Sequence, residues 1–72
     1  MIQINMEIEQ ITSPTFEYDG EKYSIFTRRF IDFNDFQNYL ERNKKSGKTK
    51  LFIHSIFTLP EQSEIWIKYR LI

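Results

Sequence analysis

The side chains of this 72-residue chain that could take part in catalysis are few and scattered. His54 is the single histidine, there is no cysteine, and no carboxylate lies near His54 along a strand or helix. A metal site or a nucleophile–base pair therefore cannot be assembled from neighbouring residues. Asp32 and Asp35 could form a carboxylate pair for acid–base chemistry, but both also fit the first turn of a helix. We expect His54 to be a polar break in an apolar strand, and we expect no enzyme activity, no cofactor and no metal.

A basic segment is the strongest charge feature of the chain. Five of its nine residues are basic, namely Arg42, Lys44, Lys45, Lys48 and Lys50. Such a cluster could neutralise the phosphates of a nucleic acid. The net charge of the whole chain is zero, however, whereas dedicated nucleic-acid-binding domains are usually strongly basic. Residues 1–41 carry eight acids and three bases, so the alternative is that the acidic and basic halves neutralise each other.

A single helix is predicted between Asp32 and Gly47. Asp32 suits the N-cap position, and Asp35 suits the positive first turn. Gly47 suits the left-handed residue that ends many helices. Three apolar residues at helical spacing should dock the helix on its neighbours: Phe33, Phe36 and Leu40.

Strand patterns surround the predicted helix. Alternation predicts a strand over Ile2–Glu9, and Asp-Gly within Phe16–Tyr23 predicts a hairpin whose second arm reaches about Phe30. In that hairpin Phe16 should face Tyr23. The segment Leu51–Thr58 is apolar on both faces, which predicts a central strand, and Ile65–Leu71 predicts a last strand.

These elements predict an α+β fold of one domain over residues 1–72. We expect one twisted, mainly antiparallel sheet in the order β-β-β-α-β-β, with the helix packed on one face. The predicted helix-side core is Ile4, Met6, Ile8, Phe16, Tyr23, Ile25, Phe33, Phe36, Leu40, Leu51, Ile53, Phe57, Ile67 and Tyr69.

The opposite face of the predicted sheet has no second helix to cover it. Its apolar residues are Phe26, Phe52, Ile56 and Trp66, with Phe30 as a further member, and its rim is Arg28, His54, Lys68 and Arg70. Aromatic residues ringed by Arg and Lys match the composition of protein–protein interfaces. We therefore expect these residues to bind a protein partner or a second copy of the chain. In the alternative, an edge strand or a loop curls over the patch.

The chain lacks Ala and Val but has eleven Ile residues, which suggests A/T-rich coding. In this composition, its length and its lack of catalytic residues, it resembles the small host-takeover and anti-defence proteins of phages. The resemblance implies a non-enzymatic module that inhibits or modulates a larger protein partner. No stretch is long and apolar enough to be a signal peptide or a membrane span, so we expect a cytoplasmic protein, in the host cytoplasm if a phage encodes it.

Overall fold

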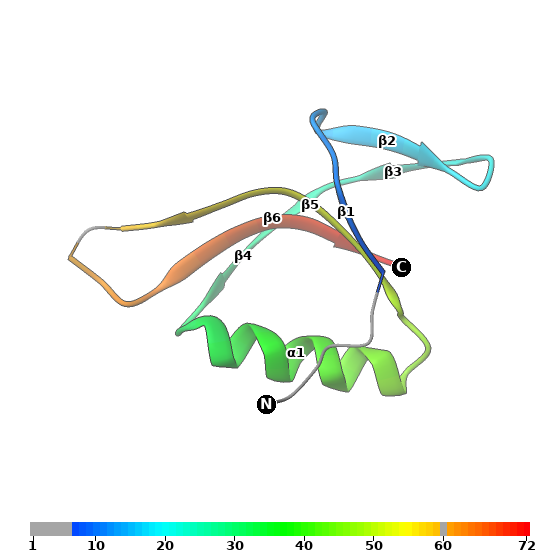
Figure 1. The fold of residues 1–72 in the computed structure, drawn as a ribbon. Coiled ribbons are helices and arrows are strands. Elements are labelled where there is room, and N and C mark those ends of the chain that lie inside the picture. Colours follow the sequence, from blue (N-terminus) through cyan, green and yellow to red (C-terminus); the bar gives the residue numbers. More distant parts are fainter. Residues whose placement is uncertain (1–6, 60) are drawn as a thin grey trace.

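The computed structural model of the chain describes residues 7–59 and 61–72, and it has an α+β fold (Figure 1). The elements are β1 (Glu7–Gln10), β2 (Thr15–Tyr18), β3 (Glu21–Ser24), β4 (Phe26–Phe30), α1 (Phe33–Lys45), β5 (Lys50–Thr58) and β6 (Ile65–Leu71). Of the strand predicted over Ile2–Glu9, the part before Glu7 lies outside the described residues.

The six described strands form two sheets, so the prediction of a single sheet is wrong. The main sheet has the order β1-β5-β6-β4, and β2 and β3 form a separate hairpin. Strand β1 runs parallel to β5, while β6 runs antiparallel to both β5 and β4. The main sheet is therefore mixed, with two antiparallel pairings and one parallel pairing.

The hairpin follows the predicted register. Phe16 pairs with Tyr23 and Glu17 pairs with Lys22 across it. Asp19 and Gly20 connect the two strands with φ angles of 51° and 80°. Two consecutive positive φ angles are what a type I′ turn requires, and Gly tolerates them because it lacks a Cβ.

The hairpin leaves the main sheet at Ile25 and lies over the face opposite the helix (Figure 1). This break replaces the long second arm predicted as far as Phe30. Phe52 of β5 explains it, because the Phe16 and Tyr18 rings lie 4.5 and 5.3 Å from the Phe52 ring. Phe52 is only 3% exposed as a result. A straight β3–β4 strand would leave these aromatic rings in water, at a cost of about 25 cal/mol per Å².

A register shift in β5 exchanges the faces of two predicted residues. Ile53 pairs with Tyr69 and Ser55 pairs with Lys68, so His54 is an additional residue between them. One extra residue reverses the alternation of all the side chains that follow it. Ile56 therefore shares the helix-side face with Ile67, and Phe57 shares the opposite face with Trp66. The predictions for Ile56 and Phe57 are both wrong for this reason.

The ends of α1 agree with the sequence. The Asp35 N–H donates to Asp32 Oδ1 at 2.8 Å, and the Ile31 N–H donates to Asp35 Oδ2 at 3.0 Å. At the other end Gly47 has a φ of 93°, and its N–H donates to the Lys44 carbonyl. These bonds satisfy backbone groups that a helix end leaves without partners.

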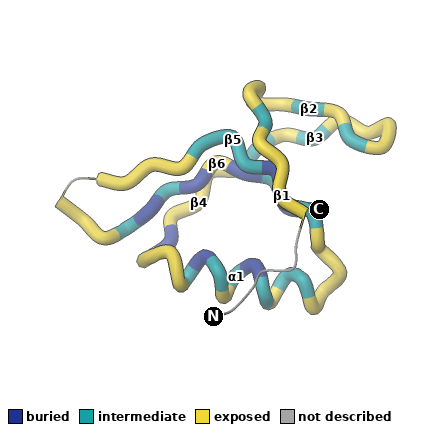
Figure 2. The backbone as a smooth tube through the Cα atoms, viewed as in Figure 1, coloured by how far each residue is buried: buried dark blue, intermediate teal, exposed yellow. Residues whose placement is uncertain are grey.

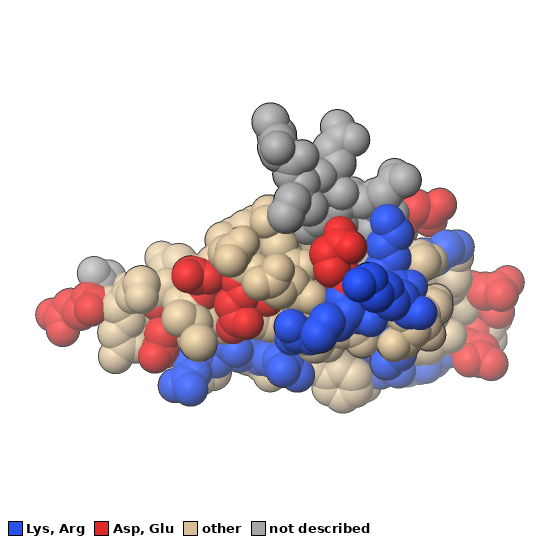
Figure 3. All heavy atoms as spheres, turned by 90° about the horizontal axis from the view of Figure 1, so that it is seen from below, with Lys and Arg blue, Asp and Glu red and all other residues tan. Residues whose placement is uncertain are grey.

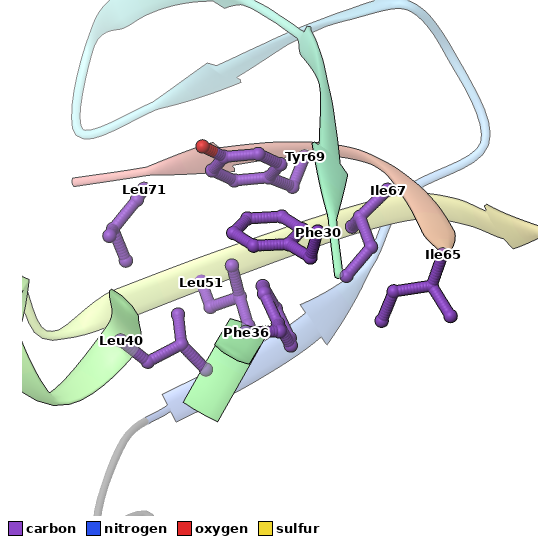
Figure 4. Packing of buried hydrophobic residues seen from close by; sticks show 8 residues of the cluster. All are labelled: Phe30, Phe36, Leu40, Leu51, Ile65, Ile67, Tyr69 and Leu71. Atoms are coloured by element: carbon purple, nitrogen blue, oxygen red, sulfur yellow. The ribbon is translucent and has the colours of Figure 1, made fainter. Parts of the chain in front are cut away.

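The core lies between α1 and the main sheet (Figures 2 and 4). Its buried residues are Phe30, Phe36, Leu40, Leu51, Ile65, Ile67, Tyr69 and Leu71. Phe36 and Leu40 are buried there, which confirms the prediction that they dock the helix. The same prediction is wrong for Phe33, which is 52% exposed at the start of the helix. Phe33 is the first residue of the helix, and its ring packs on that of Phe36, with the ring centres 5.9 Å apart, rather than in the core.

Several other core predictions differ from the structure. Phe30 belongs to the helix-side core, since it pairs with Ile65 in the β4–β6 ladder. Ile8 is exposed at the edge of the sheet. Phe16, Tyr23 and Ile25 are half-buried in or beside the hairpin and do not belong to the helix-side core. Ile4 and Met6 lie outside the described residues.

Candidate protein-binding surface

The structure divides the eight predicted interface residues among several environments. Phe52 lies on the predicted face but is buried under the hairpin. Arg28 is on the helix side, where its guanidinium carbon lies 4.5 Å from the centre of the Tyr39 ring. The wrong face was predicted for Arg28 because β4 was treated as a continuation of β3, whereas the break at Ile25 sets the phase of β4 independently.

Arg70 and Phe26 form a junction between the hairpin and the main sheet. The guanidinium carbon of Arg70 lies 4.8 Å from the centre of the Phe26 ring and 5.1 Å from that of Tyr23. Its Nη1 also donates to the Ser24 carbonyl at 3.4 Å. These contacts hold the hairpin in place, so Arg70 has an evident structural role.

Beyond the hairpin, part of the opposite face stays uncovered and carries an aromatic pair. Phe57 and Trp66 stack with their ring centres 6.3 Å apart and their planes 8° apart. Lys68 is exposed on the same strand. Trp66 and Lys68 were predicted on this face, and Phe57 was missed because a bulge cannot be recognised from apolar alternation. Nothing else in the local sequence marks its position.

Strand β5 continues well past the end of β1. The last backbone bond between them runs from the Ile11 N–H to the Ile53 carbonyl at 2.9 Å, and β5 extends to Thr58. Within the described residues, no strand pairs with this side of β5 after that point. Residues 54–59 contain no charged side chain. We call this segment the open edge.

The open edge is apolar as well as unpaired. Ile56, Phe57 and Leu59 are each 40–43% exposed. Natural edge strands are commonly protected by charged residues. The other edge of the sheet, β4, has such protection in Arg29, which pairs with Glu64 at 3.5 Å. The open edge lacks it, although the bulge at His54 limits its length.

A shallow hollow of about 330 Å³ adjoins the open edge. Its lining residues are Ile8, Glu9, Gln10, Ile53, His54, Ser55 and Ile56. The only hydrogen bond that the described residues give the His54 ring joins its Nδ1 to Ser55 Oγ, at 3.2 Å. The hollow therefore combines the apolar surface of three isoleucines with several polar groups.

The predicted basic segment surrounds the C-terminal end of α1. Arg42, Lys44 and Lys45 lie in the last helical turn, and Lys and Arg side chains gather there on the helix side of the molecule (Figure 3). Lys50 is partly engaged, since its Nζ lies 3.8 Å from Glu7 Oε2 and 4.5 Å from the centre of the Tyr18 ring. Lys48 is exposed in the following loop.

A pair of tyrosines links α1 to β6 on the helix side. The Tyr69 hydroxyl donates to the Tyr39 hydroxyl at 2.7 Å. Burial raises the pKa of Tyr69 above its ordinary value, and the bond to Tyr39 raises it further. Tyr69 is therefore held in its protonated form in a structural contact with α1, rather than acting as a source of protons at neutral pH.

Within residues 7–59 and 61–72, no group of three or more His, Asp or Glu side chains is placed to hold a metal ion. No helix in this part of the chain is long and apolar enough to cross a membrane. Comparisons of the chain with protein-family models, with curated proteins and with solved structures find no match.

Proposed function

We propose that this protein is a non-enzymatic binding module that inhibits or modulates a larger protein, and that it does so through the end of the sheet formed by β5 and β6. The observation that carries the proposal is the open edge, where unpaired strand backbone and exposed apolar side chains coincide. A partner can add a strand to such an edge, gaining main-chain hydrogen bonds together with apolar contacts.

The neighbouring features suit the same role. The Phe57–Trp66 stack provides large aromatic groups of the kind that dominate interface energetics. The adjoining hollow offers a place for one apolar side chain of the partner. The hairpin covers Phe52 on this face, so the proposed surface is smaller than the eight residues expected from the sequence.

Affinity capture from a lysate, with and without nuclease, tests the proposal. The bait is compared with the double variant Phe57→Ser and Leu59→Ser, in which both changed residues are exposed. We expect the wild type to retain a protein after nuclease treatment. After that captured protein has been purified, we expect the variant to bind it at least about tenfold more weakly than the wild type does. A tenfold change corresponds to about 1.4 kcal/mol of binding free energy.

The matched control is the double variant Ile31→Ser and Phe33→Ser. These apolar residues are exposed at the start of α1, at 67% and 52%. They should leave the affinity unchanged. Equal losses for both double variants would show non-specific apolar adhesion and would count against the proposal.

Nucleic-acid binding through the basic segment is the second candidate. The observation in its favour is the gathering of Lys and Arg at the C-terminal end of α1 (Figure 3). In the capture experiment, a bound species that nuclease removes would support this candidate over the first.

A further inference from the structure

We propose that the open edge pairs with the open edge of a second copy of this chain, antiparallel and around a two-fold axis at Phe57. This inference rests on the proposed binding role of the open edge and adds a specific occupant and register. It replaces the face-to-face dimer expected from the sequence, because the hairpin already covers Phe52 on that face.

The backbone pattern of β6 determines which groups of β5 point outward. Ile72 and Lys50 exchange two hydrogen bonds, of 2.9 and 3.0 Å, so they form a hydrogen-bonded pair. Such pairs alternate along an antiparallel ladder, and the next ones on β6 are Arg70, Lys68 and Trp66. Trp66 is paired with Phe57. Phe57 therefore directs its N–H and C=O to β6, while Ile56 and Thr58 direct theirs outward.

Only one symmetric register uses both outward-facing residues. A two-fold axis perpendicular to the sheet places the residue on the axis opposite its own copy, and places the residues before it opposite those after it in the other copy. With the axis at Phe57, Ile56 of each copy lies opposite Thr58 of the other, and both pairs form hydrogen bonds. An axis at Ile56 would place Thr58 opposite His54, whose backbone lies in the bulge.

The side chains favour the same register. The two Phe57 residues would form a non-hydrogen-bonded pair, in which side chains approach most closely. Because each Phe57 stacks on Trp66, the dimer would carry four aromatic rings in a row across the axis. On the helix side, Ile56 would be covered by Thr58 of the second copy. No charged side chain lies between residues 54 and 59, so the copies meet there without repulsion.

The paired segment is short, so the association should be weak. Interfaces that bury less than about 1,200 Å² are typical of transient complexes. We expect dissociation constants on the order of 100 μM, so that a partner protein with higher affinity can displace the second copy.

Single cysteine variants test the register, since the chain contains no cysteine. Non-hydrogen-bonded partners have Cα atoms about 4.5 Å apart, within the range that a disulfide spans. Under mild oxidation at about 100 μM protein, Phe57→Cys should form disulfide-linked dimers at least about tenfold faster than Phe26→Cys, owing to its higher effective concentration. Phe26 is the more exposed of the two, so random collisions would give the opposite order. Equal rates, or faster cross-linking through Ile56→Cys, would overturn the proposal.

Thr58→Pro tests the pairing without a cross-link. Its N–H points outward in this register, so proline removes a bond between copies but none to β6. Sedimentation equilibrium should show a concentration-dependent dimer for the wild type and a monomer for the variant, with the same circular dichroism spectrum. A wild type that stays monomeric at about 1 mM, well above the expected constant, would refute self-pairing. If the same monomeric protein still captures a partner from the lysate, self-pairing is refuted but the proposed binding function is not.

Discussion

At the scale of single residues, the helix start illustrates how local chemistry decides structure. Asp32 accepts the Asp35 N–H, and the Asp35 carboxylate accepts the Ile31 N–H. Both carboxylates thus have structural partners close in sequence. This explains the pair without acid–base catalysis, as the positions of Asp32 and Asp35 in the sequence indicated.

Replacing Asp32 with alanine should lower the free energy of unfolding by about 1 kcal/mol, the usual effect of losing an N-cap. Urea unfolding followed by circular dichroism measures the change. Asn34→Ala is the control, because Asn34 is exposed in the same turn and alanine is the better helix former. If Asp32→Ala is as stable as the wild type, the capping bond contributes nothing to the free energy of unfolding.

The raised pKa of Tyr69 makes stability depend on alkaline pH. The folded state favours the neutral hydroxyl, whereas in the unfolded state tyrosine ionises near pH 10. The stabilisation is therefore fully present below about pH 10 and is lost as the pH rises further. Tyr69→Phe should be less stable at pH 7 yet show a smaller decline between about pH 10 and 11. The same decline in both proteins would contradict this assignment.

At the scale of elements, two features change which residues face which way. The bulge at His54 reverses the phase of the second half of β5, and the break at Ile25 turns the hairpin over Phe52. The break buries Phe52 under the hairpin, and the bulge places Phe57 on the same face as Trp66.

Docking of α1 should depend on Phe36 and hardly on Phe33. Phe36 is 3% exposed and contacts the rings of Phe30 and Tyr69, so Phe36→Ala should cost about 3–5 kcal/mol. Phe33→Ala removes a half-exposed ring and should cost about 1 kcal/mol or less. Thermal unfolding of both variants measures the difference. Similar melting temperatures would show that the helix is rotated from the position described.

The faces assigned to the side chains of β5 can be tested with a second matched pair of variants. Phe52→Ala should cost about 3–5 kcal/mol, because Phe52 is buried between the sheet and the hairpin. Phe57→Ala should cost about 1 kcal/mol, since it loses one aromatic stack at an exposed position. Denaturant unfolding distinguishes them. A larger loss for Phe57→Ala would indicate that the bulge is absent in solution.

At the scale of the whole molecule, the described residues form a flat body with extents of 40 × 26 × 16 Å. The helix covers one side of the main sheet and the hairpin covers part of the other (Figure 1). Neither covers the end where β5 and β6 meet at the turn, and the exposed apolar residues Ile56, Phe57 and Leu59 remain there.

The basic segment allows a separate test of nucleic-acid binding. Changing Lys44, Lys45 and Lys48 to Gln should reduce the salt dependence of binding to duplex DNA by about 0.9 log units per lost phosphate contact. Fluorescence anisotropy at several salt concentrations measures the slope. Glu17→Gln with Lys22→Gln, in the hairpin, serves as a control. No binding of the wild type at low salt would eliminate this function.

The sequence by itself determined the features that depend on neighbouring residues. Asp32 and Gly47 mark the helix, and Asp19 and Gly20 set the hairpin register, because capping and turn geometry act within a few residues. Phe36 and Leu40 were predictable from helical spacing for the same reason.

Only the tertiary structure decided which strand faces were covered and which edge stayed open. A pattern of period two assigns faces correctly only while pairing is regular, and the bulge at His54 shifted that pattern by one residue. The hairpin bent over Phe52 because burying aromatic surface from distant parts of the chain outweighed a straight strand. The open edge of β5 likewise depends on where β1 ends along its partner, a long-range pairing that neither strand encodes alone.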